Sequence, residues 1–156
     1  MGSYSLINAD ILRPGGLVQT LLCAVDEKIV ANAEGKSFDL GGFTILPGIA
    51  DLHGDGFERH LAPRRGVVKN LQVGFDTMHS ELAANGITTP VLAQFYSWEG
   101  GMRSPEFALS FLENLTEYSP KVATGLIPQL RFETHMLDHY GRFGALCERY
   151  RVPCSV

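Results

Sequence analysis

The residues best suited to chemistry in this chain are a histidine and an aspartate two positions apart, His53 and Asp55. They stand at the end of an apolar stretch, residues 44–53, which reads as a buried strand and gives way to a polar loop at Gly54 and Gly56. Side chains alternate along a strand, so residues two apart share a face. We therefore expect the imidazole and the carboxylate to point the same way and to supply two ligands to a metal ion.

A further carboxylate, Glu133, ends another apolar stretch at residues 126–133. Strand-like stretches alternate here with helical patterns, which is typical of parallel strands joined by crossover helices. Active residues in such folds gather at the carboxyl ends of the strands, so Glu133 is expected to join His53 and Asp55. One nitrogen and several oxygens suit Zn, with Mn or Fe as alternatives, and such an ion activates water for hydrolysis. The alternative is a loop histidine, a turn-forming aspartate and a salt-bridged glutamate.

Basic residues cluster after the polar loop, although the chain as a whole has a net charge of -4. The cluster comprises Arg59, Arg64, Arg65 and Lys69. Arginine recognises phosphate well because its planar fork donates two parallel hydrogen bonds. Arg59, Arg64 and Arg65 are therefore the candidate substrate-binding residues, and a solvated loop surface is the alternative. Glu58 and Arg59 are read either as site residues or as a surface pair.

Two other residues lie close in sequence to the candidate ligands. Asp51 precedes His53 by two residues and is expected to share its face, either orienting the imidazole or pairing with a basic neighbour. His135 follows Glu133 by two residues and is a candidate further ligand or proton carrier.

The secondary-structure pattern divides the chain near residue 43. Residues 1–43 carry short apolar runs separated by turn sequences, which predicts a partial β-sandwich domain. Residues 44–156 are expected to form a second domain in which strands and helices alternate. Ser104 and Pro105 predict the cap and first position of one of its helices. Helices are expected at 70–85, 106–117 and 136–151, and strands at 44–53, 87–95, 126–133 and 152–156.

Composition narrows the classes of protein to consider. The 156 residues are 45% hydrophobic and 19% charged, which is a globular profile. The acidic balance argues against a nucleic-acid partner, and no apolar run reaches the ~18 residues that a membrane span needs. Three widely spaced cysteines do not suggest a disulfide framework, and no secretory signal is evident at the start. We therefore expect a cytoplasmic protein without a nucleic-acid or membrane partner.

Several segments resemble the amidohydrolase superfamily of metal-dependent hydrolases. The segment LPGIADLHGD, preceded by DEKIVA and DLGG, is similar to the junction between the small β-sandwich and the (β/α)8 barrel of that superfamily. The segments HGDGFERHLAPRRGV, LAANGITT and LRFE are similar to its phosphonate-utilisation branch. Enzymes of that branch hydrolyse ribose 1-methylphosphonate 5-triphosphate to the 5-phosphate and diphosphate.

The resemblance implies roles for the residues singled out above. His53 and Asp55 would be metal ligands of the first barrel strand, and Glu133 would match a third-strand glutamate ligand. The arginine cluster would hold polyphosphate. The pattern departs from the usual His-x-His, because aspartate stands at position 55.

Length is the larger departure from the family. A (β/α)8 barrel takes about 250 residues, whereas this chain supplies about three βα units. The later strands, which in the family carry two histidines and the water-activating aspartate, have no counterpart. We therefore expect an α/β fold consisting of a β-sandwich-like segment and the first part of a TIM barrel, from a fragment or truncated gene product. An open barrel edge would favour a homo-oligomer.

The function expected is that of a metal-dependent diphosphatase acting on a small phosphorylated substrate. A hydrolase of C–N bonds from the same superfamily is the first alternative. A metal-free fragment with a structural or self-association role is the second.

Overall fold

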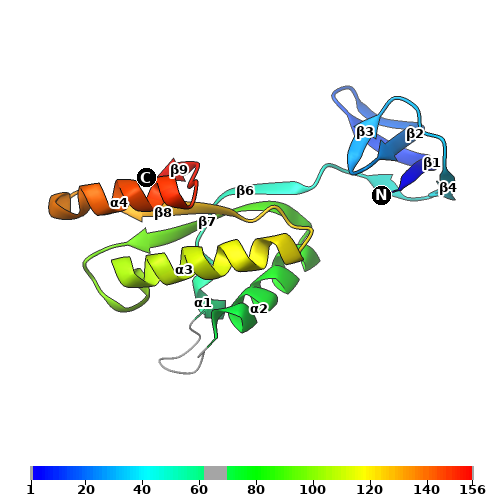
Figure 1. The fold of residues 1–156 in the computed structure, drawn as a ribbon. Helices are drawn as coiled ribbons and strands as arrows, with labels where there is room; N and C mark the ends of the chain where they lie inside the picture. The colour runs from blue at the N-terminus through cyan, green and yellow to red at the C-terminus, as the bar shows by residue number, and fades with distance from the viewer. Residues whose placement is uncertain (1, 62–69, 156) are drawn as a thin grey trace. The chain divides into compact units, whose positions relative to one another are not determined.

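The computed structural model describes residues 2–61 and 70–155, and it shows a chain of two compact units (Figure 1). One unit ends at Pro47 and the other begins at Gly48. The described residues form a five-stranded sheet, a four-stranded sheet and four α-helices. The predicted mixed α/β class is therefore confirmed. Among these residues, no helix is both long and apolar enough to cross a membrane.

In the described part of the first unit, residues 2–47, the regular elements are all strands, as the short apolar runs indicated. Its strands run in the order β3-β2-β1-β4, and β5 also pairs with β1. The pairs β1–β2 and β2–β3 are antiparallel, whereas β4 and β5 lie parallel to β1. The strands are β1 (Ser3–Arg13), β2 (Gly16–Val25), β3 (Lys28–Val30), β4 (Lys36–Asp39) and β5 (Thr44–Ile45).

Strand β1 continues through residues 8–10, where its pairing with β2 is irregular. The register with β2 shifts between Leu6 and Ala9, and Asn8 in this irregularity has a φ of 66°. Asparagine tolerates this left-handed conformation better than most residues because its side chain can hydrogen-bond locally. Asn8 Nδ2 donates to Asp39 Oδ1 at 3.0 Å, so the bulge is fastened to the neighbouring strand β4.

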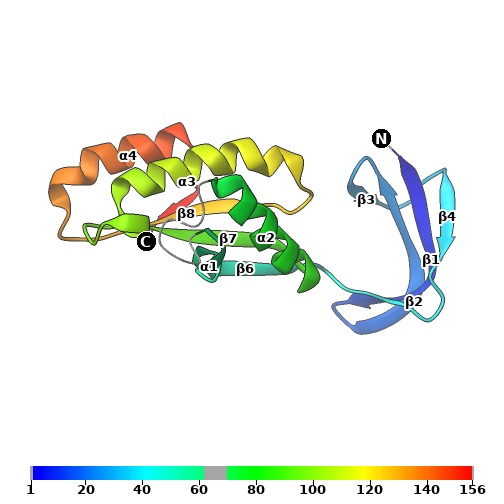
Figure 2. The same ribbon diagram turned by 90° about the horizontal axis from the view of Figure 1, so that it is seen from below.

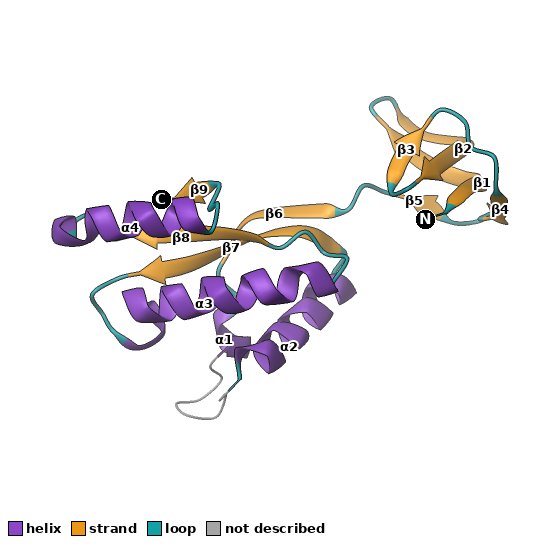
Figure 3. Cartoon of the chain, in the orientation of Figure 1, coloured by secondary structure: helices purple, strands orange, loops and turns teal. Residues whose placement is uncertain are grey.

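The second unit contains a parallel sheet whose strands follow the order of the sequence (Figure 3). The pairs β6–β7, β7–β8 and β8–β9 are all parallel, which confirms the predicted arrangement of strands with crossover helices. The strands are β6 (Ile49–Gly54), β7 (Ile87–Tyr96), β8 (Ile127–Phe132) and β9 (Cys154–Ser155). The helices are α1 (Glu58–Leu61), α2 (Leu71–Ala84), α3 (Pro105–Tyr118) and α4 (Tyr140–Arg149), with 3-10 turns η1 (Gly101–Arg103), η2 (Ser119–Lys121) and η3 (Leu137–His139).

The stretch 44–53 is not the single strand that its apolar character suggested. Its first two residues form β5 and pair with β1 in the first unit, whereas β6 begins only at Ile49. Pro47 lies between them and has no N–H to donate to a ladder. At Gly48 a Cβ would come within 2.1 Å of Thr88 Oγ1, so only glycine allows this close approach of the two strands.

The start of helix α3 follows the predicted capping chemistry. Ser104 Oγ accepts a hydrogen bond from the Phe107 backbone N–H at 3.1 Å, with Pro105 at the first helical position of α3. At its other end α3 stops one residue later than predicted, at Tyr118. The expected helix at 136–151 is shorter than predicted. Its first residues form the turn η3, and α4 begins at Tyr140 without a side-chain cap.

The apolar core of the second unit lies between the parallel sheet and its helices. Helices α2 and α3 lie side by side along one face of the strands (Figure 2). The ring of Phe75 from α2 meets that of Phe111 from α3 at 5.8 Å, and Phe143 from α4 packs against Tyr96 of β7. Leu130 of β8 is buried in the same cluster. Because side chains alternate, the neighbours of Leu130 on β8 lie on the opposite face of the sheet.

Candidate active site

A bulge in β6 decides which way the candidate histidine points. In the register of the two strands, Asp51 pairs with Pro90 and Gly54 pairs with Leu92. The two residues of β6 between these pairs therefore lie opposite a single residue of β7, which defines the bulge. Asp51 consequently lines a pocket on the helix-covered face together with Pro90 and Leu92. The expectation that Asp51 shares the face of His53 is wrong, because a bulge interrupts the alternation on which it rested. Asp51 Oδ1 instead accepts from the backbone N–H of His53 at 3.2 Å.

The His53 ring reaches across the sheet to β8. Its Nδ1 lies 2.5 Å from Oε1 of Gln129, which is only 3% exposed. A carboxamide oxygen can only accept, so the shared proton belongs to Nδ1 of the imidazole. Neutral imidazole carries one proton, and Nε2 is therefore left with a lone pair. Gln129 thus fixes the tautomer in which Nε2 can bind a metal ion or accept a proton.

The two predicted carboxylate ligands lie where strands end. Asp55 follows β6 directly, and Glu133 follows β8 directly. Glu133 is close enough to Arg103 for their charges to interact. In residues 2–61 and 70–155, no group of three or more His, Cys, Asp or Glu side chains lies in an arrangement that could hold one metal ion. The ligand set of His53, Asp55 and Glu133 therefore stays a prediction.

A half-buried carboxylate, Glu58, stands beside these strand ends. Burial raises the pKa of its carboxyl, and the charges of Arg103 and Arg131 act in the opposite direction. Its Oε1 is inaccessible to solvent and has no hydrogen-bond partner among the described residues. Asp55 adds to the rise in pKa through repulsion between the two carboxylates. Glu58 was expected to be either a site residue or part of an exposed surface pair with Arg59. Its half-buried position beside Asp55 and Arg103 favours the first alternative.

The loop after β7 is held in place by buried polar contacts. Gln94 is completely buried, and its Nε2 donates to the carbonyl oxygen of Met102 at 2.7 Å. The Ser97 backbone N–H donates to the carbonyl oxygen of Arg103 at 2.6 Å. These bonds fold the loop back over the carboxyl end of β7. They bring Arg103, which pairs with Glu99 through Nη1 at 2.6 Å, beside the strand ends.

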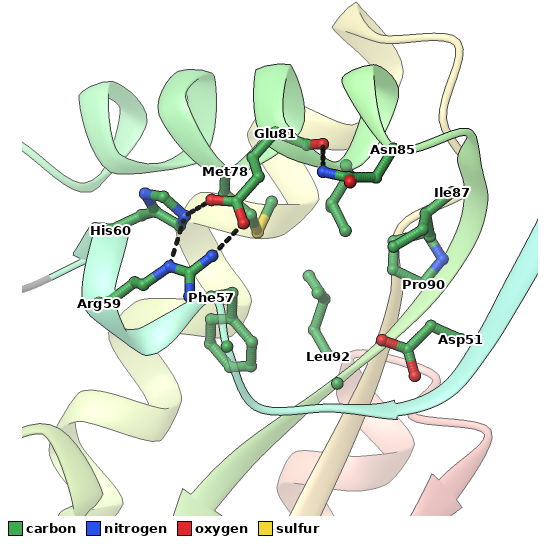
Figure 4. Close-up of a pocket in the computed structure, with 13 residues that line it drawn as sticks. Asp51, Phe57, Arg59, His60, Met78, Glu81, Asn85, Ile87, Pro90 and Leu92 are labelled. Atoms are coloured by element: carbon green, nitrogen blue, oxygen red, sulfur yellow. Dashed lines mark hydrogen bonds and ion pairs between the residues drawn. The ribbon is translucent and has the colours of Figure 1, made fainter.

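Arg59 lies apart from this group, on the helix-covered face. It borders a pocket of about 150 Å³ between the first strands of the sheet and α1 and α2 (Figure 4). Its guanidinium pairs with the carboxylate of Glu81, whose Oε2 also lies 2.6 Å from Nε2 of His60. Met78 and Leu92 supply apolar wall to the pocket. The structure thus gives Arg59 a carboxylate partner within the chain.

Of the remaining predicted residues, only His135 lies within the described part of the chain. Arg64, Arg65 and Lys69 lie outside the described residues. His135 is exposed in the loop after β8, and its ring centroid lies 6.0 Å from that of Trp98 in the loop after β7. The pairing places two aromatic rings from separate loops next to each other beyond the strand ends.

Gln129 and Arg131 are the residues that the sequence-based reasoning missed. They lie on β8 on the face opposite the core, between apolar neighbours that point into it. A signal for them was present, because Gln129, Arg131 and Glu133 are polar at every second position of one strand. Such alternation in a strand that is otherwise apolar indicates a polar face.

Two comparisons with known proteins give no match for this chain, so the interpretation of the site rests on its own residues. A scan against protein-family models gave no match, and a search of curated proteins gave none either.

Proposed function

We propose that this chain carries the first part of the active site of a metal-dependent hydrolase, at the carboxyl ends of β6, β7 and β8. The ion, with zinc as first choice and manganese or iron as alternatives, would be held by His53, Asp55 and Glu133. When bound, it would supply a hydroxide at neutral pH. The substrate we propose is ribose 1-methylphosphonate 5-triphosphate, with hydrolysis to the 5-phosphate and diphosphate.

The observation that carries the proposal is the contact between His53 and Gln129. Histidines that bind metal ions almost always donate their other ring N–H to a carbonyl or carboxylate oxygen, which fixes the ring and its tautomer. His53 has such an arrangement at the end of a parallel strand. The donor set is compatible with it, because imidazole nitrogen and carboxylate oxygen are both ligands that Zn²⁺ takes in proteins.

The fold is consistent with the proposal at a coarser level. The four parallel strands follow the sequence order, and the helices that connect them pack against one face. This is also the order in which the strands of a (β/α)8 barrel follow one another. We propose that the second unit corresponds to the first part of such a barrel, and that two copies associate through its open edge.

Calorimetric titration of the chain with Zn²⁺ and Mn²⁺ tests the metal site directly. We expect binding by the unmodified chain and a loss of at least about tenfold in affinity for His53→Gln. His79→Gln is the matched control, because His79 lies on α2 with its ring against Tyr118. Retained affinity in the His53 variant would contradict the proposed role of this histidine. No binding by the unmodified chain, together with a melting temperature indifferent to chelator, would favour the metal-free fragment instead.

Hydrolysis assays separate the two enzymatic alternatives. Because the proposed site is only the first part of an active site, the assays use a full-length relative of this chain. The substrates are the ribose triphosphate and an N-acetylated sugar, each with added Zn²⁺ and each followed by product release. Release of diphosphate that is abolished when the histidine corresponding to His53 is replaced by glutamine supports the proposed reaction. Cleavage of the amide without release of diphosphate would select the C–N hydrolase.

A further inference from the structure

Two guanidinium groups each lie over the same aromatic ring, at the carboxyl ends of the strands. Cζ of Arg131 lies 3.9 Å from the ring centroid of Phe95, and Cζ of Arg103 lies 4.2 Å from it. Arg131 and Phe95 are direct neighbours in the register of β8 and β7. Cation–π attraction holds a guanidinium by its face and leaves its N–H groups available in the plane. The ring therefore orients both groups without using their donors.

The two arginines differ in how their charge is balanced. Arg103 forms an ion pair with Glu99, and this hydrogen bond holds its pKa above the usual value. For Arg131, no carboxylate oxygen in the described part of the chain lies within ion-pair distance, although Glu58 acts on it at longer range. Arg131 is half-buried. A guanidinium that is partly withdrawn from water and lacks a carboxylate partner is suited to binding an anion from outside the chain.

The position of Arg131 relates it to the candidate metal ligand. Arg131 follows Gln129 by two residues on β8, so the two side chains share the face opposite the core. Gln129 is the residue that meets His53. An anion bound by Arg131 would therefore lie on the same face as the imidazole, one step nearer the carboxyl ends. Arg59 offers no such setting, because its guanidinium is paired with Glu81 on the helix-covered face.

We propose that Arg131, assisted by Arg103 across the Phe95 ring, forms a binding site for a phosphate group of the substrate. The choice of phosphate among oxyanions rests on the proposed function, whereas the presence of an anion site rests on the arginine geometry alone. Arg131 would donate two parallel N–H bonds to phosphate oxygens, and Arg103, whose Nη1 is engaged by Glu99, would offer its remaining N–H groups. This assigns phosphate binding to two arginines beyond the cluster that follows the polar loop, of which Arg64 and Arg65 lie outside the described residues.

Binding of inorganic pyrophosphate to the chelator-treated, metal-free chain tests the site. Isothermal titration is run on the unmodified chain and on Arg131→Met, Arg131→Lys and Arg59→Met. We expect Arg131→Met to weaken binding at least about tenfold, because removing the fork removes charge-assisted hydrogen bonds. Arg131→Lys should be intermediate, since it keeps the charge and loses the fork. Arg59→Met should stay within about twofold of the unmodified chain, because it leaves the Arg131 fork intact.

The outcomes that overturn the proposal are equally specific. They are equal binding in Arg131→Met, loss of binding in Arg59→Met, or no binding of pyrophosphate by the unmodified chain. Acetate provides a further arm, and if it competes as strongly as phosphate, the phosphate assignment is wrong. Circular dichroism checks the fold of each variant, and Arg103→Gln, expected to weaken binding less, replaces Arg131→Met if that variant unfolds.

Because metal is absent from these titrations, the result is independent of the metal site. Pyrophosphate binding that depends on Arg131, together with no metal binding at His53, would refute the hydrolase proposal and leave the anion site standing. Metal binding at His53 without pyrophosphate binding would do the reverse.

Discussion

At the scale of single residues, the site depends on a buried carboxamide rather than on a charged group. Gln129 is 3% exposed and contacts Nδ1 of His53 from two strands away. A carboxamide oxygen accepts the Nδ1 proton and thereby fixes the tautomer of the ring. The geometry therefore leaves Nε2 as the ring nitrogen that can bind a metal ion.

Replacing Gln129 should loosen the candidate metal site without removing a ligand. We expect Gln129→Leu to lower Zn²⁺ affinity by about 10–100-fold, the usual cost of losing a partner that orients a ligand. Nitrogen NMR of the ring should show Nδ1–H predominating in the unmodified chain and a mixture of tautomers in the variant. Gln19→Leu, an exposed residue of β2, is the matched control. An unchanged tautomer in Gln129→Leu would contradict this role.

Tyr118 makes the alkaline stability of the chain predictable. Burial and a hydrogen bond to Asp76 raise its pKa to about 12. The folded state thus keeps the phenol protonated where the unfolded state ionises, so stability is fully present below pH ~10 and is lost as pH rises towards 12. Tyr118→Phe should cost about 1 kcal/mol at neutral pH, through loss of the hydrogen bond. Urea unfolding of the unmodified chain and of the variant at pH 7 and at pH 10.5 measures the cost of the substitution and its pH dependence. If the stability difference between the two chains grew with pH, the raised pKa of Tyr118 would be contradicted.

At the scale of elements, the crossover helices are placed by local capping and by aromatic packing against the sheet. Helix α3 begins at a serine cap, and its buried side chains include Phe111 and Leu112, which are at most 1% exposed. Helix α4, which lacks a side-chain cap, contributes fewer buried residues. Because these helices connect parallel strands that are neighbours in the sheet, the carboxyl ends of the strands lie next to one another.

Removal of the α3 cap should destabilise the second unit by a modest amount. Ser104→Ala leaves the Phe107 N–H without its acceptor, and we expect a loss of about 1 kcal/mol in the free energy of unfolding. Ser110→Ala, inside the same helix, is the control and should be neutral or slightly stabilising, because alanine favours helix interiors. Denaturant unfolding monitored by circular dichroism compares the two. Equal effects at both positions would show that the cap contributes nothing.

At the scale of the whole molecule, the chain consists of two units with separate hydrogen-bonded sheets. The apolar cluster of the second unit draws only on residues beyond Gly48. The first unit has buried residues of its own, among them Ile11 and Cys23. Each unit therefore has its own interior, even though β5 lies in the stretch expected to belong to the second domain.

The second unit should fold without the first. We expect residues 48–156 expressed alone to show a helical circular dichroism spectrum and a cooperative melt, since their core is complete within this segment. The melting midpoint should match that of the corresponding transition in the full chain. A disordered spectrum for 48–156 would show that the first unit is required, and light scattering of both chains would test association through the open edge.

The sequence by itself determined the class of fold, the alternation of strands and helices, and the placement of Asp55 and Glu133 at the carboxyl ends of strands. These features follow from local rules, namely apolar periodicity, capping residues and turn chemistry, so neighbouring residues suffice to predict them. The family resemblance and the reaction it implies stay proposals.

Only the tertiary structure decided which groups meet. The bulge in β6 turned Asp51 away from His53, and the parallel pairing of three strands brought Gln129 to the imidazole. The same pairing of strands placed the guanidinium of Arg131 over the ring of Phe95. The packing of α1 against α2 brought Arg59 into an ion pair with Glu81. Residues up to 76 positions apart in the chain make these contacts. No local pattern encodes them, because register and bulges are set by the packing of whole strands.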